Sequence, residues 1–358
     1  MVIKSLSLKE FRNYSCITFD FLPGVNFIHG NNGQGKTNLV ESLFFSTHLK
    51  SYRTSKLHAI CKSGHDSAWI QTMLSKQKVD HELSILIERG RKRVVLDGKT
   101  LLLTSEFVRS FISLLFAPDQ LVFFKEYPLE RRAFFDRVLF LIDGNYHLWI
   151  KEFNRIKKQK CIVLKKRSDS DLDVWNRLLS EIIPKITQAR QEVTVKINQS
   201  LTTVFQELTG RKGTLLLSFR SDLQGKVDLN ASEIYNFLSG KKEKEYDMGY
   251  LLYGSHRDDY WLSLDQKKDR YTFSQGEYRI SFLALQLAIN KIIGEEMKFN
   301  PILLLDDIFS ELDEPVSRRS IEYISQNKNQ MFITSTSIPQ DILKTGTSYR
   351  IESGKLVN

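Results

Sequence analysis

The stretch "FIHGNNGQGKTNL", residues 27 to 39, combines a glycine-rich run with a Lys-Thr pair. The spacing from Gly30 through Gly35 to Lys36 and Thr37 fits the phosphate-binding loop pattern, in which four residues separate the two glycines. A turn rich in Gly and Asn is the plain alternative, and the surrounding sequence decides against it.

The flanking residues provide the strand–loop–helix setting that a phosphate-binding loop needs. Phe27 and Ile28 read as the end of a buried strand, and residues 36 to 46 read as a helix. The glycines let backbone N–H groups converge on an anion, Lys36 can reach the β- and γ-phosphates, and the Thr37 hydroxyl can ligate Mg²⁺. The residues expected to bind a nucleoside triphosphate are Gly30, Asn31, Asn32, Gly33, Gln34, Gly35, Lys36 and Thr37.

Composition bounds the class of protein. The 358 residues are 41% hydrophobic and 26% charged, as in a globular chain with room for two lobes. Lys and Arg number 52 against 42 Asp and Glu, a net charge of +10 that suits a polyanion such as nucleic acid but also ordinary solubility. The three cysteines are far apart, and no apolar run approaches a membrane span, so we expect a cytoplasmic protein without a disulfide framework or zinc site.

Periodicity divides the chain into three parts. The first third reads as β-rich, with an antiparallel meander over residues 68 to 75, 79 to 88 and 92 to 103. Residues 130 to 166 and 175 to 208 read as two long helices joined by a polar turn, an antiparallel helical arm in which Pro184 should cause a kink. The last third returns to alternating helices and buried strands. We therefore predict an α/β nucleotide-binding head made of residues 1–120 and 251–358, interrupted by a helical lobe over residues 121–250.

A second motif places carboxylates near the phosphate loop. The apolar run from Ile302 to Leu305 leads into Asp306 and Asp307, the Walker B pattern. A strand buried on both faces delivers these carboxylates to the carboxyl edge of the sheet, where ligands bind. We expect Asp306 to hold Mg²⁺ and Asp307 to act, with Lys36, in catalysis by orienting or deprotonating the attacking water. An Asp-Asp turn after a core strand is the alternative.

The run "SQGEYR", residues 274 to 279, precedes Walker B. Taken alone it is a helix start with Ser274 as N-cap. Its position between the phosphate loop and Walker B instead favours an ABC-type signature motif, in which Ser274 and Gly276 would cap the γ-phosphate of a nucleotide bound to a second subunit. Asp313, six residues after Asp307, matches the D-loop of the same superfamily.

These motifs together resemble the RecF family of bacterial recombination-mediator ATPases, an ABC-type group related to the structural-maintenance-of-chromosomes (SMC) ATPases. Matching stretches run through most of the chain: "LKEFRNY" (8–14), "GNNGQGKTNLVESL" (30–43), "APDQLVFFKEYPLERRAFFD" (117–136), "GSHRDDY" (254–260), "SQGEYRISFLAL" (274–285) and "ILLLDDIFSELD" (302–313). The arm is far shorter than SMC coiled coils.

The resemblance implies a function that composition does not. It implies a head that forms a homodimer on binding ATP, slow hydrolysis, and binding to single-stranded, gapped or junction DNA. It further implies the partners RecR and RecO in loading recombinase. By the same resemblance Arg12 and Asn13 would lie near the nucleotide, although Arg12 could equally cap a strand end.

The chain departs from the ABC pattern at several positions. Glu277 stands where Gln is usual, Phe273 replaces the leading Leu of the signature, and Thr334 and Thr336 occupy the place of the switch histidine. No residue can be assigned to the Q-loop. An ABC transporter ATPase subunit, another SMC-like ATPase and a small-molecule kinase are the rival functions; the first predicts a switch histidine, and the last predicts no signature motif.

A basic stretch over residues 151 to 167 has Lys151, Arg155, Lys158 and Lys165 near one helical face. Several of these side chains could contact successive DNA phosphates, or the face could simply be solvated. With no helix-turn-helix or zinc finger evident, we expect any DNA binding to depend on shape and backbone.

Overall fold

The computed structural model describes residues 1–358 except 102–103, 269–271, 310–311, 327–328, 337–344 and 358. The chain forms two compact units. Unit 1 comprises Met1–Leu121, Phe205–Lys212 and Ser274–Asn358, and unit 2 comprises Val122–Val204 and Gly213–Phe273. Within the described residues, no helix is long and apolar enough to cross a membrane.

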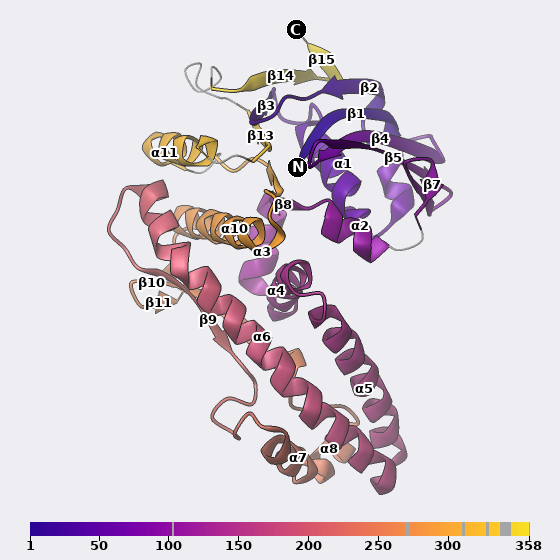
Figure 1. The fold of residues 1–358 in the computed structure, drawn as a ribbon, viewed down its shortest axis with the longest axis vertical. Coiled ribbons are helices and arrows are strands. Elements are labelled where there is room, and N and C mark those ends of the chain that lie inside the picture. Colours follow the sequence, from indigo (N-terminus) through magenta and orange to yellow (C-terminus); the bar gives the residue numbers. More distant parts are fainter. Residues whose placement is uncertain (102–103, 269–271, 310–311, 327–328, 337–344, 358) are drawn as a thin grey trace. The chain divides into compact units, whose positions relative to one another are not determined.

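Unit 1 contains two six-stranded sheets (Figure 1). The antiparallel sheet has the order β2-β1-β4-β5-β6-β7. Its strands are β1 (Val2–Phe11), β2 (Tyr14–Asp20), β4 (Ser67–Lys76), β5 (Val79–Glu88), β6 (Arg91–Leu96) and β7 (Lys99–Thr100). Side chains alternate between a buried and a solvated face, as Ala68, Ile70 and Leu74 of β4 show. The meander is confirmed as far as Thr100, with the third segment divided at the Asp97-Gly98 turn, while its predicted end at residues 102–103 lies outside the described residues.

The second sheet carries the motifs. Its order is β15-β14-β3-β13-β12-β8, and all neighbours are parallel except the pair β14 and β15. The strands are β3 (Val25–His29), β8 (Ser113–Phe116), β12 (Ile302–Leu305), β13 (Met331–Ser335), β14 (Thr347–Glu352) and β15 (Lys355–Val357). Because β13 lies between β3 and β12, the segments that follow these three strands meet at one carboxyl edge.

Helices complete unit 1. They are α1 (Lys36–His48), the 3₁₀ turn η1 (Leu57–Ile60), α2 (Thr104–Ser110), α10 (Gln275–Met297) and α11 (Glu314–Ser325). Helix α1 contacts both β4 and β13, so apolar residues of α1 share one core with both sheets. Helix α3 (Pro118–Glu126) crosses the unit boundary.

Unit 2 is built from helices and a small sheet (Figure 1). Its helices are α4 (Pro128–Ile142), α5 (Tyr146–Lys166), most of α6 (Asp169–Thr209), α7 (Ala231–Ser239), α8 (Lys242–Met248) and η2 (Ser255–Arg257). The sheet has the order β11-β10-β9, from β9 (Leu215–Arg220), β10 (Asp259–Leu264) and β11 (Lys267–Lys268).

The predicted arm needs two corrections. The first long helix is two helices, because Asp143, Gly144 and Asn145 interrupt it between α4 and α5. The unit boundary lies at residue 273 and not at 250, because β9, β10 and η2 belong to unit 2, while residues 205–212 at the end of α6 belong to unit 1. Helix α6 continues through Pro184 without interruption.

Two of the stretches that carry the resemblance to the RecF family meet inside unit 2. Arg190 of α6 is buried and donates hydrogen bonds to Asp258, at 2.7 Å, and to Asp136, at 2.9 Å. Arg131 of α4 forms a bidentate ion pair with the carboxylate of Asp259. The "RRAFFD" and "GSHRDD" residues thus form one buried charge network that fixes the lobe.

Candidate nucleotide-binding site

The phosphate loop, residues 30–35, is braced by two turns from elsewhere in unit 1. In the β1–β2 turn, the Asn13 side chain donates to the Gln34 carbonyl at 3.0 Å, and the Tyr14 hydroxyl donates to the Gly35 carbonyl at 2.9 Å. In the β14–β15 turn, the Gly354 N–H also donates to the Gln34 carbonyl, at 3.0 Å. Asn13 therefore lies against the loop, and its contact with a nucleotide stays a prediction.

Two of the loop glycines are required because neighbouring groups approach them closely, backbone at Gly30 and side chains at Gly35. At Gly30, which has a φ of +146°, an added Cβ would lie 2.3 Å from the Ile351 carbonyl oxygen. At Gly35, which has a φ of +119°, a Cβ would lie 2.6 Å from the Asn13 amide. Residues with a side chain rarely adopt either of these φ values. Glycine is therefore needed at both positions of the motif for steric reasons.

Lys36 begins α1 and points back over the loop. Its Nζ donates to the Gly30 carbonyl at 2.7 Å and to the Asn31 carbonyl at 2.9 Å. Burial lowers the pKa of Lys36, while the nearby Asp307 and Asp306 oppose that shift. Asn31, Asn32 and Gly33 are exposed at the apex of the loop.

Asp306 is the point where three hydroxyl groups converge. Its Oδ1 accepts from Thr37, at 3.2 Å, and from Thr334, at 2.7 Å, and its Oδ2 accepts from Tyr52 at 3.4 Å. Burial raises the pKa of Asp306, and the bonds from Thr334 and Thr37 oppose the rise. Burial raises the pKa of Tyr52 far above its ordinary value, and the negative charge of Asp306 adds to the rise.

The Thr37 hydroxyl and the Asp306 carboxylate fit a magnesium ion. Both are hard oxygen donors of the kind that Mg²⁺ takes alongside nucleotide phosphates and water. They come from residues 269 positions apart in the chain and meet within hydrogen-bond distance. The two oxygen donors therefore suit a shared Mg²⁺, and the metal site stays a prediction.

Asp307 follows with its backbone in the left-handed region, at a φ of 48°. Its N–H donates to the Thr334 hydroxyl at 2.9 Å, and its carbonyl accepts from the Arg279 guanidinium at 2.8 Å. Such a conformation costs a non-glycine residue on the order of 1 kcal/mol, so these two contacts hold a strained peptide.

Arg12 supports the site through α1. It has a φ of 53° in the β1–β2 turn, and its guanidinium makes a two-pronged bond to Glu41 of α1, at 2.9 and 2.7 Å. Glu41 is fully buried and also accepts from Arg53 at 3.2 Å. Arg12 thus neutralises a buried carboxylate beside the phosphate loop.

The signature residues lie at the start of α10. Ser274 is the exposed N-cap, and its hydroxyl accepts from the Glu277 N–H at 3.2 Å while the Glu277 carboxylate accepts from the Ser274 N–H at 2.9 Å. The unusual Glu277 therefore completes a capping box. Gly276 lies in the first turn. Asp313 caps α11 by accepting from the Val316 N–H at 3.0 Å, while Ser310 and Glu311 of the D-loop lie outside the described residues.

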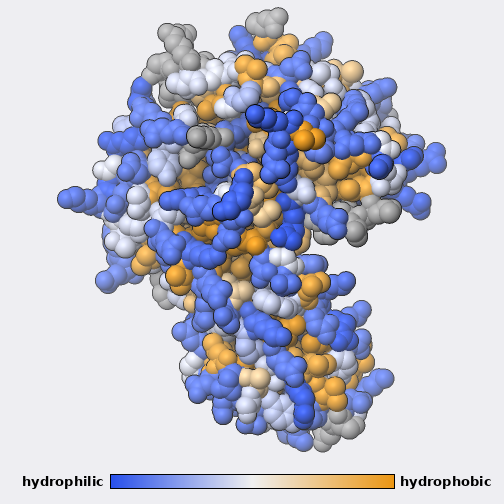
Figure 2. Space-filling view, in the orientation of Figure 1, coloured by the Kyte–Doolittle hydropathy of each residue, from blue (hydrophilic) through white to orange (hydrophobic). Residues whose placement is uncertain are grey.

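The four cations predicted to bind DNA are all exposed on α5, in unit 2. Arg155 pairs with Glu152 at 2.6 Å, which leaves its charge partly neutralised. A further basic cluster lies on unit 1, where Arg89, Arg91 and Arg93 are exposed at the β5–β6 hairpin. Figure 2 shows hydrophilic residues over most of the visible face, with apolar areas between them.

Sequence reasoning missed three residues at this edge of the sheet. Tyr52 follows α1 in a segment without a recognisable motif. The sequence marks Thr334 only as a residue in the place of the switch histidine. Gln120 lies in the first turn of α3, after the strand β8 that neighbours Walker B, and its buried Oε1 has no hydrogen-bond partner among the described residues. Because β8 pairs with β12, the residues after β8 lie beside the Walker B carboxylates. That pairing is the signal that would have placed Gln120 at this edge of the sheet.

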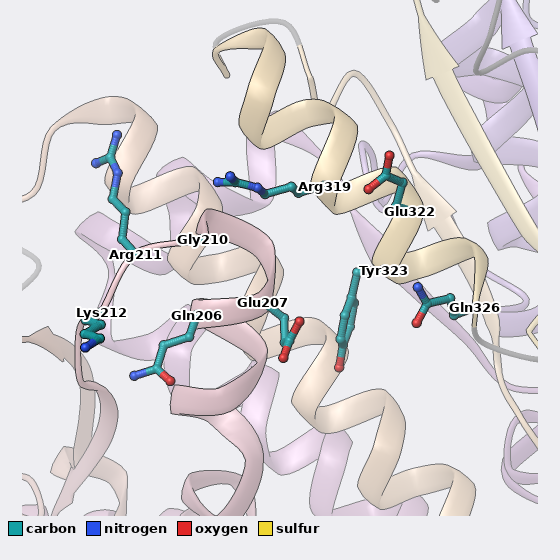
Figure 3. A pocket seen from close by; sticks show the side chains of 9 residues that line it. All are labelled: Gln206, Glu207, Gly210, Arg211, Lys212, Arg319, Glu322, Tyr323 and Gln326. Carbon is teal, nitrogen blue, oxygen red and sulfur yellow. The ribbon is translucent and has the colours of Figure 1, made fainter.

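A separate cavity of about 420 Å³ lies in unit 1 between the end of α6 and α11 (Figure 3). Arg319 donates to the Thr209 carbonyl at 2.8 Å, and Tyr323 and Glu207 line the same cavity. The lining side chains mix both charges, and none belongs to the predicted nucleotide site.

Comparison with known proteins assigns the chain to a family. Residues 2–351 match the family model described as "RecF/RecN/SMC N terminal domain". The chain is 32% identical to the "DNA replication and repair protein RecF" of Staphylococcus carnosus over 370 residues, covering 100% of both chains. It is 31% identical to the protein of the same name from Clostridium acetobutylicum, covering 99% of both.

Solved structures of similar proteins support the same fold and family. One described as "Structure of the recombination mediator protein RecF-ATP in RecFOR pathway" superposes with a TM-score of 0.86 at 26% identity, covering 99% of this chain and 98% of that one. An Smc head bound to the C-winged helix domain of ScpA superposes with a TM-score of 0.62 at 17% identity and shares the fold. The chain has the ABC-type, SMC-like head fold with an inserted helical lobe, and it belongs to the RecF family.

Proposed function

We propose that this protein is an ATP-dependent DNA-binding protein of recombinational repair and replication maintenance. The observation that supports this most is the meeting of Lys36, Thr37, Asp306 and Asp307 at one sheet edge, with the Thr37 hydroxyl 3.2 Å from the Asp306 carboxylate. A related RecF structure described as RecF-ATP supports ATP as the nucleotide. The names of the RecF relatives support replication and repair as the process.

In this proposal each residue has one task. The N–H groups of residues 30–35 and the Lys36 ammonium bind the triphosphate, and Thr37 and Asp306 hold Mg²⁺, which supplies positive charge to the phosphates. Asp307 orients the water that attacks the γ-phosphate. Ser274 and Gly276 of a second copy cap that phosphate, so ATP joins two heads.

The protein acts as a switch more than as a fast enzyme. ATP-driven homodimerisation precedes slow, DNA-stimulated hydrolysis, and the dimer assists recombinase loading with RecR and RecO. The absence of the switch histidine supports slow turnover, because Thr334 is committed to Asp306 and to the Asp307 backbone. Gapped, single-stranded or junction DNA is the expected polyanion.

Two variants separate ATP binding from hydrolysis. Lys36→Ala removes the cation for the β/γ-phosphates, so ATP affinity should fall by two orders of magnitude or more. Asp307→Asn keeps the nearly isosteric side chain, so Mg²⁺–ATP should bind while hydrolysis stalls and ATP-bound dimers accumulate on gel filtration. Unchanged ATP affinity in Lys36→Ala would contradict the loop assignment, and wild-type hydrolysis by Asp307→Asn would remove its catalytic role.

DNA binding by α5 is tested by charge reversal. Lys158→Glu with Lys165→Glu should weaken binding uniformly across sequences and reduce the salt slope by about one unit for each lost phosphate contact. Arg91→Glu with Arg93→Glu, on the exposed hairpin of unit 1, is the matched comparison. If only the hairpin pair weakens binding, the DNA site lies on the head and not on α5.

A further inference from the structure

Thr334 occupies the strand between the two nucleotide-binding motifs. In β13 it pairs with Ile28 of β3, just before the phosphate loop, and the neighbouring Ile333 pairs with Leu305, just before Asp306. Its side chain is fully buried, with 0% exposure. The hydroxyl therefore lies at the carboxyl edge, between the loop and the Walker B carboxylates.

One hydroxyl group links the two carboxylate residues. Thr334 donates its proton to Asp306 Oδ1 at 2.7 Å and accepts the Asp307 N–H at 2.9 Å. Asp306 is thereby tied to the peptide that carries Asp307. Because that peptide is in the left-handed region, its orientation depends on contacts and not on backbone preference.

We propose that Thr334 is a positioning residue that couples the metal-side carboxylate, Asp306, to the water-side carboxylate, Asp307. Through this hydroxyl the position of Asp306 fixes the orientation of the Asp307 peptide, and with it the place of the catalytic carboxylate. This inference rests on the proposed ATPase function and adds a residue to it.

A purely structural role makes a different prediction. Thr72 offers the comparison, because it is also fully buried in unit 1 and its hydroxyl lies 2.7 Å from the Ser46 hydroxyl, within the core. If buried hydroxyl pairing were all that mattered, Thr334→Val and Thr72→Val should have equal effects. Thr334→Val keeps the side-chain shape while it leaves the Asp307 N–H without its acceptor.

The experiment measures single-turnover hydrolysis, ATP affinity, dimer mass with ATP, and thermal unfolding for Thr334→Val, Thr334→Ser and Thr72→Val. We expect Thr334→Val to hydrolyse ATP at least tenfold more slowly, with ATP affinity within threefold of wild type and dimers still formed. Thr334→Ser, which keeps the hydroxyl, should restore the rate. Thr72→Val should lower only the unfolding temperature.

Hydrolysis at the wild-type rate by Thr334→Val, or an equal loss of rate in Thr72→Val, would overturn the inference. If Thr334→Val does not fold, Thr334→Cys makes the same comparison, because its thiol bonds only weakly, and a wild-type rate in that variant would overturn the inference equally. A wild-type chain that neither binds nor hydrolyses ATP would instead overturn the proposed function.

Discussion

At the scale of single residues, His256 shows how burial sets a protonation state. It lies in the "GSHRDD" stretch of unit 2, with Nε2 3.1 Å from the Leu251 carbonyl and its ring tilted over Phe153. Burial, aided by the charge of Lys157, lowers the pKa of His256 to about 4. The folded lobe therefore holds the neutral ring.

That shift predicts acid sensitivity of the lobe. The unfolded chain takes up a proton at His256 below about pH 6.5, whereas the folded chain does so only near pH 4, so stability is present above pH 6.5 and is lost as the pH falls through that window. Between pH 7 and 5, wild type should lose about 2 kcal/mol more than His256→Gln.

Urea unfolding followed by tryptophan fluorescence measures this difference, because three of the four tryptophans, Trp149, Trp175 and Trp261, lie in unit 2, and only Trp69 lies in unit 1. Each variant is compared with itself at the two pH values, which cancels any stability that the substitution changes at neutral pH. Equal acid losses in the two proteins would show that His256 is not the group responsible.

At the scale of elements, the buried charge network holds α4, α6 and β10 together. Arg190 contacts Asp258, Asp136, the Tyr146 hydroxyl and the Ser255 carbonyl, and Asp258 is itself fully buried. Removing one partner of such a pair leaves an uncompensated buried charge. The stability of unit 2 therefore depends on this network.

Arg190→Met should destabilise unit 2 by about 3–5 kcal/mol, because Asp258 keeps its burial and loses its cation. The matched control is Arg155→Met, which removes an exposed pair with Glu152 on the same lobe and should leave the stability of the lobe nearly unchanged. The midpoints of urea unfolding decide between them. Similar small losses in both variants would mean that the network adds specificity without stability.

The elements also show what the sequence could predict. The phosphate loop, α1 and the Walker B strand are local patterns, since glycine spacing and an unbroken apolar run signal them within a dozen residues. Thr37 and Asp306, in contrast, meet only because β13 lies between β3 and β12. Tyr52 and Thr334 depend on the same topology, so no local pattern could assign their roles.

Two errors in the helical lobe have similar causes. The helical spacing of apolar residues continues on both sides of Asp143, Gly144 and Asn145. The periodicity alone therefore predicts one continuous helix where the structure has α4 and α5. The boundary at residue 250 was wrong because the residues after it pair with unit 2: Asp259 of β10 bonds to Arg131, 128 residues earlier in the chain. Charge pairs at that separation are not visible in a linear pattern.

At the scale of the whole molecule, the proposed site is divided between two copies of the chain. Lys36 lies at the phosphate loop, while the Ser274 hydroxyl is exposed at the start of α10 and available to a second molecule. Each homodimer would hold two sites, and each site would combine the loop of one copy with the signature of the other. Variants in the two motifs should therefore complement each other.

The last prediction mixes two inactive variants. Lys36→Ala loses ATP at both sites of its homodimer, and Ser274→Arg places a bulky cation where the γ-phosphate must dock. In a mixed dimer one site carries both lesions, and the other combines an intact Lys36 with an intact Ser274. Partial ATPase activity should return on mixing, up to about half that of wild type for each mixed dimer, since one of two sites is whole.

The assay needs high protein concentration with DNA present, because a single intact site holds the dimer less firmly than two. The control mixes Lys36→Ala with Asp307→Asn. If Asp307 acts on the ATP held by its own chain, each site of that mixed dimer keeps one lesion in its loop half, so activity should stay absent. An ATPase that works within one chain gives no rescue in either mixture. Mixed dimers that form with ATP yet remain inactive for the Lys36 and Ser274 pair would contradict the shared site, and rescue confined to that pair would support it.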